Sequence, residues 1–289
     1  METRRCSMYS YTLEQWLFFF YFYCFFGWCF ESAYVSLKKR HPVNRGFMRG
    51  PFLPLYGSGA IMMLVVSMPF QDNLWLTYIA GCIGATTLEY VTGVAMEALF
   101  KVRYWDYSKQ KFNFQGQICL TSTLAWGGLT ILMTRGLHKP IERLVMAIPV
   151  NILELVIMTL TICVVVDFTL SFKAAIDLRD ILFKMEEAKE ELERIQKRLD
   201  VVIAISNEEL ERKRHELHLK RQIYPENIKE EILELRMKYK MNVEHRLQLT
   251  ELKDFYKRHL IKGNPGMVSK RFKDTLQELK ESVDERLKK

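Results

Sequence analysis

Long apolar stretches separated by short polar segments make up the first 172 residues of the chain. Two of them carry no charge: 22 residues lie between Arg49 and Asp72, and 23 lie between Lys111 and Arg135. Each is long enough for a helix to cross a hydrocarbon core of about 30 Å at ~1.5 Å per residue. Both stretches therefore predict transmembrane helices.

Three further apolar stretches each contain two carboxylates; they cover residues 13–37, 74–100 and 144–172. The first is not a cleaved signal, because its aromatic run is followed by Glu31 and basic residues instead of a small-residue cleavage site. With the charge-free stretches they predict about five spans. We therefore expect an all-α fold, with a polytopic transmembrane helical bundle over residues 1–172.

The rest of the chain follows a seven-residue repeat and then becomes mainly charged. Apolar residues are spaced by alternating three and four positions at Leu178, Ile181, Met185, Ala188, Leu192, Ile195, Leu199 and Val202. This spacing predicts a cytosolic coiled-coil helix over residues 173–223, which Tyr224-Pro225 ends, and a charged helical tail over 224–289. The seam either joins two protomers in a homodimer or packs against the chain's own tail.

Charge distribution predicts orientation. Residues 1–172 carry 14 Lys+Arg and 10 Asp+Glu, and residues 173–289 carry 28 and 24, so each part has a net charge of +4. This even balance does not indicate a nucleic-acid partner. Nine basic residues and the tail fall on one side of the five spans, and five fall on the other, which predicts an outside N-terminus and a cytosolic tail in the plasma membrane. Residues 101–117 could instead re-enter the bilayer.

Motifs for metal or nucleotide chemistry are missing from the sequence. The six cysteines form no CxxC pair, and the histidines lie apart from them, so we expect neither a metal nor a cofactor. The phosphate-binding pattern GxxxxGK[ST] does not occur. Enzymatic activity is therefore not the default expectation, although these patterns do not decide it.

Carboxylates within the spans are the main candidate chemistry. A charged group at the centre of a membrane helix costs ~2.5 to 3.5 kcal/mol on insertion scales, so Glu31, Glu89 and Glu97 require partners or have a function. Glu89, Gly93 and Glu97 share a helix face, because eight residues correspond to about 80° of rotation. The expected partners are the arginines of the two adjacent basic loops, Arg45, Arg49 and Arg103.

Two loop segments have unusual compositions. Residues 44–59 contain two prolines and four glycines, which interrupt a regular helix and predict a folded entry into the second span. Residues 103–116 mix aromatic with polar side chains. A position at the membrane surface is the ordinary explanation for Trp105, whereas Asp106 and Asn113 are less easily explained in this way.

The chain resembles the bacterial ABC-transporter permease (type IV) family of polytopic membrane proteins. The similarity rests on NRGFMRGPFLPLYGSGA, on LEYVTG followed by Glu97, on RYWDYS, and on Asn113 with GQICL, and it covers roughly residues 11–140. The motif residues carried over by position are Glu31, Asn44, Arg45, Gly46, Gly50, Pro51, Pro54, Tyr56, Gly57, Glu89, Tyr90, Gly93, Glu97, Trp105, Asp106, Tyr107, Asn113, Gly116 and Cys119. With Arg49 and Arg103, the polar members form a candidate substrate site near the cytosolic side.

Three functions remain as hypotheses. The first is a permease-like transport subunit, which the resemblance implies and which would need a separate ATPase subunit. Five spans instead of the usual six, and the lack of an EAA-type coupling motif, depart from that pattern. The second is a membrane-embedded enzyme acting on a lipid-linked substrate, with Glu89 or Asp106 as the base. The third is a membrane-anchored coiled-coil assembly protein.

Overall fold

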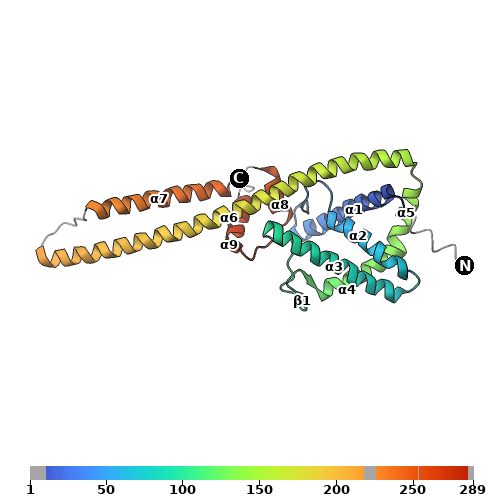
Figure 1. The fold of residues 1–289 in the computed structure, drawn as a ribbon, viewed down its shortest axis with the longest axis horizontal. Coiled ribbons are helices and arrows are strands. Elements are labelled where there is room, and N and C mark those ends of the chain that lie inside the picture. Colours follow the sequence, from blue (N-terminus) through green and yellow to red (C-terminus); the bar gives the residue numbers. More distant parts are fainter. Residues whose placement is uncertain (1–10, 218–225, 253, 286–289) are drawn as a thin grey trace. The chain divides into compact units, whose positions relative to one another are not determined.

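The computed structural model describes residues 11–217, 226–252 and 254–285. These residues form helices and one short hairpin, so the predicted all-α class is confirmed (Figure 1). The chain divides into two compact units. The first comprises residues 1–179 and 254–271, and the second comprises residues 180–253 and 272–289.

The first unit is a helical bundle in which consecutive helices pack on one another. Its helices are α1 (Leu13–Lys39), α2 (Pro54–Ser67), α3 (Leu74–Phe100), α4 (Leu120–Leu132), α5 (His138–Met146), the first part of α6 (Val150–Leu217) and α8 (Phe255–Gly263). A 3₁₀ turn, Met68–Phe70, follows α2, and a π-helical turn, Met133–Leu137, joins α4 to α5. Strand β1 (Asn113–Phe114) pairs antiparallel with β2 (Ile118–Cys119).

Side-chain caps explain where the main helices begin. Thr12 and Gln15 form a reciprocal capping box at the start of α1. The Asn73 side chain accepts hydrogen bonds from two backbone N–H groups at the start of α3. Helices α1 and α3 end where Arg40 and Lys101 take left-handed conformations, so the chain turns sharply into the two basic loops.

The first unit is apolar outside as well as inside. Phe19, Leu64 and Val145 belong to its buried core. On the outer surface, however, Ile83 of α3 is 64% exposed and Ile162 of α6 is 59% exposed. Large exposed apolar surfaces are rare on soluble proteins and are the rule where lipid is the solvent.

Two described helices are long and apolar enough to cross a membrane: α3 and the first part of α6. The apolar segment Pro54–Phe70 is shorter. The α1 helix contains glutamate, glutamine, tyrosine and tryptophan residues among its phenylalanines, and α4 ends after 13 residues at the π-helical turn. The five-span topology therefore stays a prediction.

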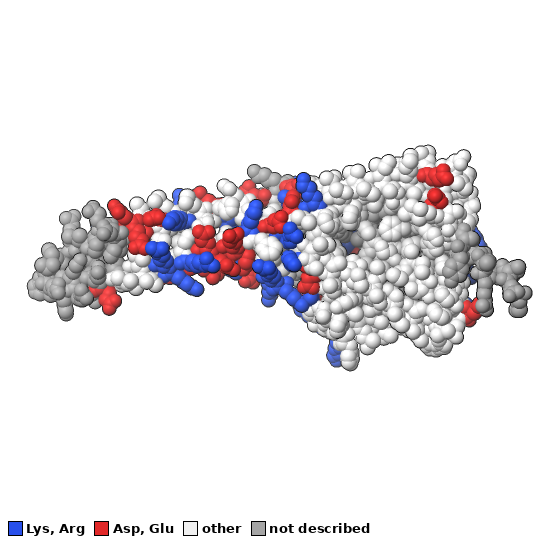
Figure 2. Space-filling view, viewed as in Figure 1, with Lys and Arg blue, Asp and Glu red and all other residues white. Residues whose placement is uncertain are grey.

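The second unit consists of the later part of α6, α7 (Glu226–Thr250) and α9 (Lys273–Glu285). Arg198 of α6 lies 2.8 Å from Glu231 of α7, and Leu182, Met185, Leu235 and Leu279 are buried. Charged side chains cover these helices, whereas the visible surface over α1–α4 is almost free of them (Figure 2).

The heptad seam in α6 is partly buried within one chain. Met185 and Ile195 are buried, and Leu192 and Leu199 are half-buried. The structure thus contains contacts of the kind expected if the helix packs against its own tail. Pairing of two protomers through Leu178, Ile181, Met185, Leu192, Ile195 and Leu199 stays a prediction without support from this structure.

Candidate functional site

The end of α1, the first basic loop and the start of α2 meet at Glu31. The Tyr56 hydroxyl donates a hydrogen bond to Glu31 Oε2 over 2.6 Å, and Arg45 Nε lies 3.4 Å from Glu31 Oε1. The Arg45 backbone N–H also donates to Ser32 Oγ. The chain turns into α2 at Pro54, the first residue of that helix, which brings Tyr56 back toward α1. We call Glu31, Arg45 and Tyr56 the Arg45 cluster.

The Arg45 cluster is completed by a segment more than 200 residues away in the sequence. Arg45 Nη1 donates to Asn264 Oδ1 over 2.8 Å and to the Gly263 carbonyl over 3.1 Å. Asn264 Nδ2 in turn donates to the Gly46 carbonyl over 2.9 Å. His259 Nε2 lies 2.8 Å from the Met48 carbonyl oxygen and donates to it. The segment 254–271 therefore covers this part of the loop.

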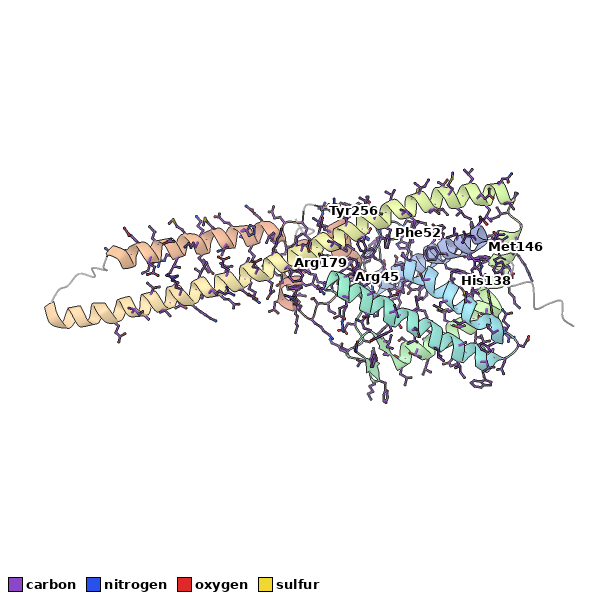
Figure 3. The ribbon with its side chains drawn as sticks, viewed as in Figure 1. Arg45, Phe52, His138, Met146, Arg179 and Tyr256 are labelled. Carbon is purple, nitrogen blue, oxygen red and sulfur yellow. The ribbon has the colours of Figure 1, made fainter. Side chains whose placement is uncertain are left out.

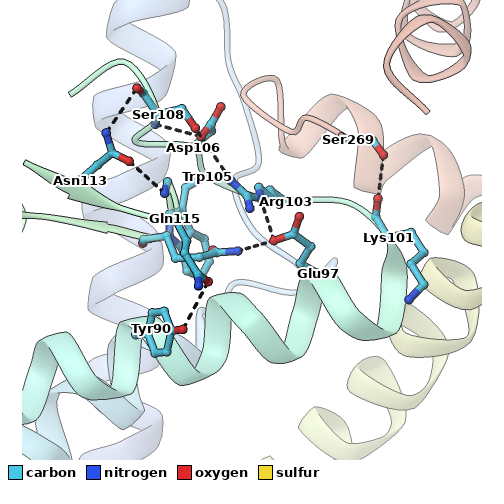
Figure 4. Close-up of polar contacts among 12 residues, drawn as sticks. Tyr90, Glu97, Lys101, Arg103, Trp105, Asp106, Ser108, Asn113, Gln115 and Ser269 are labelled. Carbon is cyan, nitrogen blue, oxygen red and sulfur yellow. Dashed lines mark hydrogen bonds and ion pairs between the residues drawn. The ribbon is translucent and has the colours of Figure 1, made fainter. Parts of the chain in front are cut away.

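A second arginine, Arg103, occupies the other basic loop and is only 4% exposed. Its Nε lies 2.8 Å from Glu97 Oε2, and its Nη1 lies 3.7 Å from Asp106 Oδ1 (Figure 4). Gln117 Nε2 donates to the same Glu97 oxygen over 2.6 Å. Trp105 Nε1 donates to the Gln117 carbonyl over 2.9 Å. We call Glu97, Arg103, Asp106 and Gln117 the Arg103 cluster.

The hairpin loop holds Asp106 in a fixed position. Ser108 donates to Asp106 Oδ1 through its backbone N–H and its hydroxyl, and Asn113 Oδ1 accepts from Gly116 N over 3.1 Å. Burial raises the pKa of Asp106, but the Ser108 hydrogen bonds and the charge of Arg103 outweigh it, so the pKa lies below its ordinary value. Gly116 has φ +73°, and a Cβ there would touch Asp106 and Arg103, which explains why glycine occupies this position.

The Arg103 cluster also contacts the segment 254–271. Arg103 and Val268 exchange both backbone hydrogen bonds, over 2.7 and 2.9 Å. The Ser269 hydroxyl donates to the Lys101 carbonyl over 2.8 Å (Figure 4). One short segment thus contacts both basic loops of the first unit.

Glu89 lies about two turns before Glu97 on the same face of α3 and is 5% exposed. Tyr107 OH donates to its Oε1 over 3.0 Å, and Trp126 Nε1 donates to its Oε2 over 2.9 Å. Burial, and then the neighbouring charge of Glu89, raise the pKa of Tyr107 above its ordinary value. The charge of Glu31 acts on Tyr107 in the same direction, so Glu31 and Glu89 lie near one hydroxyl.

Close backbone approach explains Gly93, between Glu89 and Glu97 on the same face of α3. A Cβ at this position would overlap Gln117 Oε1 and would lie 3.1 Å from the Trp105 ring. Gly93 therefore lets the hairpin segment rest against α3. The remaining residues of the predicted structural motif lie in or next to the loop before α2: Gly46, Gly50, Pro51, Pro54, Tyr56 and Gly57.

Two predicted polar residues lie outside the carboxylate contacts. The Arg49 guanidinium stacks over the Phe255 ring at 4.0 Å, and among the described residues it makes no ion pair with Glu31, Glu89 or Glu97. The expectation that Arg49 pairs with one of these acids is therefore wrong in this structure, because α8 places aromatic rings beside it. Asn44 accepts from Trp28 Nε1 over 2.6 Å and donates to the Arg49 carbonyl, so it shapes the loop.

A further buried polar network was not predicted. His138 is 1% exposed and lies between two tyrosine hydroxyls: Tyr11 OH is 3.2 Å from Nε2 and Tyr23 OH is 2.8 Å from Nδ1. Tyr11 also donates to Glu142. Figure 3 labels His138 and Arg45, which contact different portions of α1. In the sequence the only indication of this network was weak: tyrosines at one end of an apolar stretch.

The described part of the chain contains no candidate metal site. No group of three His, Cys, Asp or Glu side chains there is placed to hold a metal ion. The five described cysteines are free thiols. The clusters are instead built from arginine–carboxylate pairs and from hydroxyl, amide and indole donors.

The fold and these clusters define a helical membrane protein with a buried polar site. The family model described as Putative ABC-transporter type IV matches residues 18–172, which is more than half of the chain, and the protein belongs to this family. Comparisons with curated proteins and with solved structures gave no match. The matched region contains Glu31, Glu89, Glu97, Arg45 and Arg103, but not the segment 254–271.

Proposed function

We propose that this protein is the membrane subunit of a transporter and that the Arg45 cluster, the Arg103 cluster and Glu89 form its substrate path. The observation that carries the proposal is the concentration of three glutamates and two arginines in a helical unit whose visible surface in Figure 2 is largely uncharged. Ionisable groups within membrane helices commonly mark substrate or ion pathways. Family membership supports transport over the enzymatic and assembly alternatives.

The proposal includes five spans in the plasma membrane, with the N-terminus outside and the tail in the cytosol. Contacts of the segment 254–271 with both Arg45 and Arg103 support a common side for the two basic loops. A common side is what alternating spans and the distribution of Lys and Arg require. Reporter fusions at residues 140 and 175 test this: the first should report outside and the second inside. The opposite result at either position would contradict the five-span topology.

The energy source in this proposal is a separate ATPase subunit, because the chain has no phosphate-binding motif. The first experiment is gentle extraction of the tagged full-length protein from its native membrane, followed by mass spectrometry of co-purifying proteins and lipids. A stoichiometric nucleotide-binding subunit is expected. Purification of the protein alone with a bound lipid-like molecule would contradict the ATPase-driven mechanism.

Substitutions then test the site. In the purified complex reconstituted in vesicles, Arg45→Ala should reduce substrate-stimulated ATP hydrolysis ~10-fold or more, because it removes the charge that holds Glu31 and Asn264. A tenfold decrease in rate corresponds to about 1.4 kcal/mol. Lys262→Ala, on the same segment as Asn264 but outside the cluster, is the matched control. Equal activity of the two variants would contradict a role for the Arg45 cluster.

A further inference from the structure

An apolar groove lies on the surface of the first unit, between α3, α4 and the hairpin, and its volume is about 360 Å³. Residues from all three elements line it, including Cys82, Ile83, Thr86, Tyr90, Phe114 and Thr123. On α3 the lining extends from Cys82 to Tyr90, which corresponds to about 12 Å along the helix at ~1.5 Å per residue. The groove therefore follows a helix that is long and apolar enough to cross a membrane.

Three hydroxyl groups of the groove donate to partners within the protein. Thr86 Oγ1 donates to Thr123 Oγ1 over 3.1 Å, and Thr87 Oγ1 donates to the carbonyl four residues before it over 2.7 Å. The Tyr90 hydroxyl donates to Gln115 Oε1 over 3.3 Å (Figure 4). A ligand in the groove thus need not accept hydrogen bonds from these hydroxyls, so a hydrocarbon chain can lie there without leaving them unpaired.

The hairpin end of the groove carries two largely exposed aromatic side chains. Phe112 is 82% exposed and Phe114 is 55% exposed, although the Phe114 ring lies 5.6 Å from the ring of Tyr90. Phe112 also has φ +54°, in the left-handed region that bulky residues rarely adopt. Aromatic side chains that protrude beside a spanning helix are typical of the boundary between a bilayer and water.

Two lysines lie in the same loop as these aromatic residues. Lys109 and Lys111 are exposed, and neither belongs to an ion pair among the described residues. The Asn113 side chain holds the loop in place, since its Nδ2 donates to the Gln110 carbonyl over 2.8 Å. Lys111 precedes Phe114 by three residues, which span at most about 11 Å, so its long side chain can reach the end of the groove. Positive charge at the end of an apolar groove is complementary to the phosphate of a lipid.

We propose that the groove between α3, α4 and the hairpin binds one anionic phospholipid, with an acyl chain along α3 and the phosphate at Lys109 and Lys111. A neutral lipid would match the groove but not the two charges, and a soluble anion would match the charges but not the groove. In the orientation proposed above, the hairpin lies on the cytosolic side, where anionic lipids attract basic residues. The site does not require transport or an ATPase subunit, so its failure and the failure of the proposed function are separate outcomes.

The charges are tested by native mass spectrometry of the purified full-length protein, titrated in detergent with dioleoyl phosphatidylglycerol or with dioleoyl phosphatidylcholine. We expect the wild type to bind the first phosphatidylglycerol more tightly. Lys109→Gln/Lys111→Gln should weaken this binding ~10- to 30-fold, because each lysine near an anionic lipid contributes about fivefold. The control, Lys38→Gln/Lys39→Gln, removes the same charge from exposed positions before the other basic loop and should leave binding unchanged. Equal wild-type affinity for the two lipids, or equal affinity of the two double variants, would overturn the proposal.

A second pair of variants tests the groove without altering charge. Thr87 lines the groove and is exposed, so Thr87→Trp places a ring in it without repacking the bundle. Binding of phosphatidylglycerol should fall ~10-fold or more, because about two buried methylene groups account for that factor. Ile162→Trp adds the same ring to the exposed surface of α6 and should bind as the wild type does.

Two results with these variants would overturn the proposal. Wild-type affinity in Thr87→Trp would show that lipid is attracted to the lysines alone and that no acyl chain occupies the groove. A wild-type dimer that dissociates in Thr87→Trp would instead assign the groove to a second copy of this chain.

Discussion

The two units use the same ion pair in different surroundings. Arg103 and Glu97 in the first unit are 2.8 Å apart, and so are Arg198 and Glu231 in the second. Arg103, however, is 4% exposed and Arg198 is 68% exposed. Equal distances therefore do not imply equal importance, because water can replace the partner of an exposed charge but not that of a buried one.

The two units also differ in the contacts that hold their segments together. In the second unit the charges cover a core that includes Leu182, Met185 and Leu279, and that core holds the helices together. In the first unit the arginines join the two basic loops to residues 254–271, in addition to apolar contacts such as those of Phe47 with Phe100 and Tyr104. Charged side chains therefore lie mainly on the surface of the second unit, whereas in the first unit they form contacts between segments of the interior.

The largest effect that follows from this comparison is expected for Arg103→Met. The substitution leaves Glu97, which is 28% exposed, without its cation and removes the buried charge beside Asp106, so it should cost ~1.5 to 3 kcal/mol of unfolding free energy. Detergent-titrated unfolding of the full-length protein, followed by circular dichroism, measures this loss. Arg103→Lys keeps the positive charge but lacks the planar guanidinium, so its loss of unfolding free energy should be smaller than that of Arg103→Met. A loss below about 1 kcal/mol in Arg103→Met would contradict the internal role of this pair.

Local sequence patterns predicted much of the arrangement around these arginines. The apolar stretches at residues 13–37 and 74–100 correspond closely to α1 and α3, because long apolar runs and caps are local signals. Helical periodicity placed Glu89, Gly93 and Glu97 on one face, and the structure brings Glu97 to Arg103 and Glu31 to Arg45. These are pairs of rare charges in an apolar setting, so few partners were available.

Contacts between distant segments could not be predicted in the same way. Asn264 reaches Arg45, and Val268 joins Arg103 through backbone groups that any residue possesses. Neither contact has a periodic or compositional signature. For Arg49 the predicted partner was a carboxylate, because the side chain is charged. In the structure its guanidinium lies over the ring of Phe255. The sequence could not distinguish among the possible partners of these arginines, and tertiary packing determines which contacts they make.

A medium effect is expected at His259, which joins the segment 254–271 to the first basic loop. Burial lowers the pKa of His259, although its hydrogen bond to the Met48 carbonyl opposes this shift. Below the unfolded value of about 6.5 the unfolded state takes up a proton that the folded state resists, so stability should fall as the pH drops through that value. Removing the hydrogen bond in His259→Ala should cost ~0.5 to 1.5 kcal/mol at pH 8.

Thermal unfolding of the detergent-solubilised protein from pH 8 to pH 5 measures the pH effect. His259→Gln should flatten the decrease in part, because His138 is also a buried histidine whose pKa is lowered by burial. His41→Gln is the control, since His41 is exposed and contacts only its own loop. An identical decrease in wild type and His259→Gln would show that His259 does not sense pH through its burial.

The smallest effect is expected for the exposed counterpart of Arg103. In Arg198→Met the partner Glu231 remains in contact with water, so the loss of unfolding free energy should be about 0 to 1 kcal/mol, and salt should reduce it further. The same detergent titration, repeated at low and high salt, compares this variant with Arg103→Met. If Arg198→Met were as destabilising as Arg103→Met, burial would not explain the difference between the two units, and the contacts between α6 and α7 would have to depend on charge rather than on their apolar core.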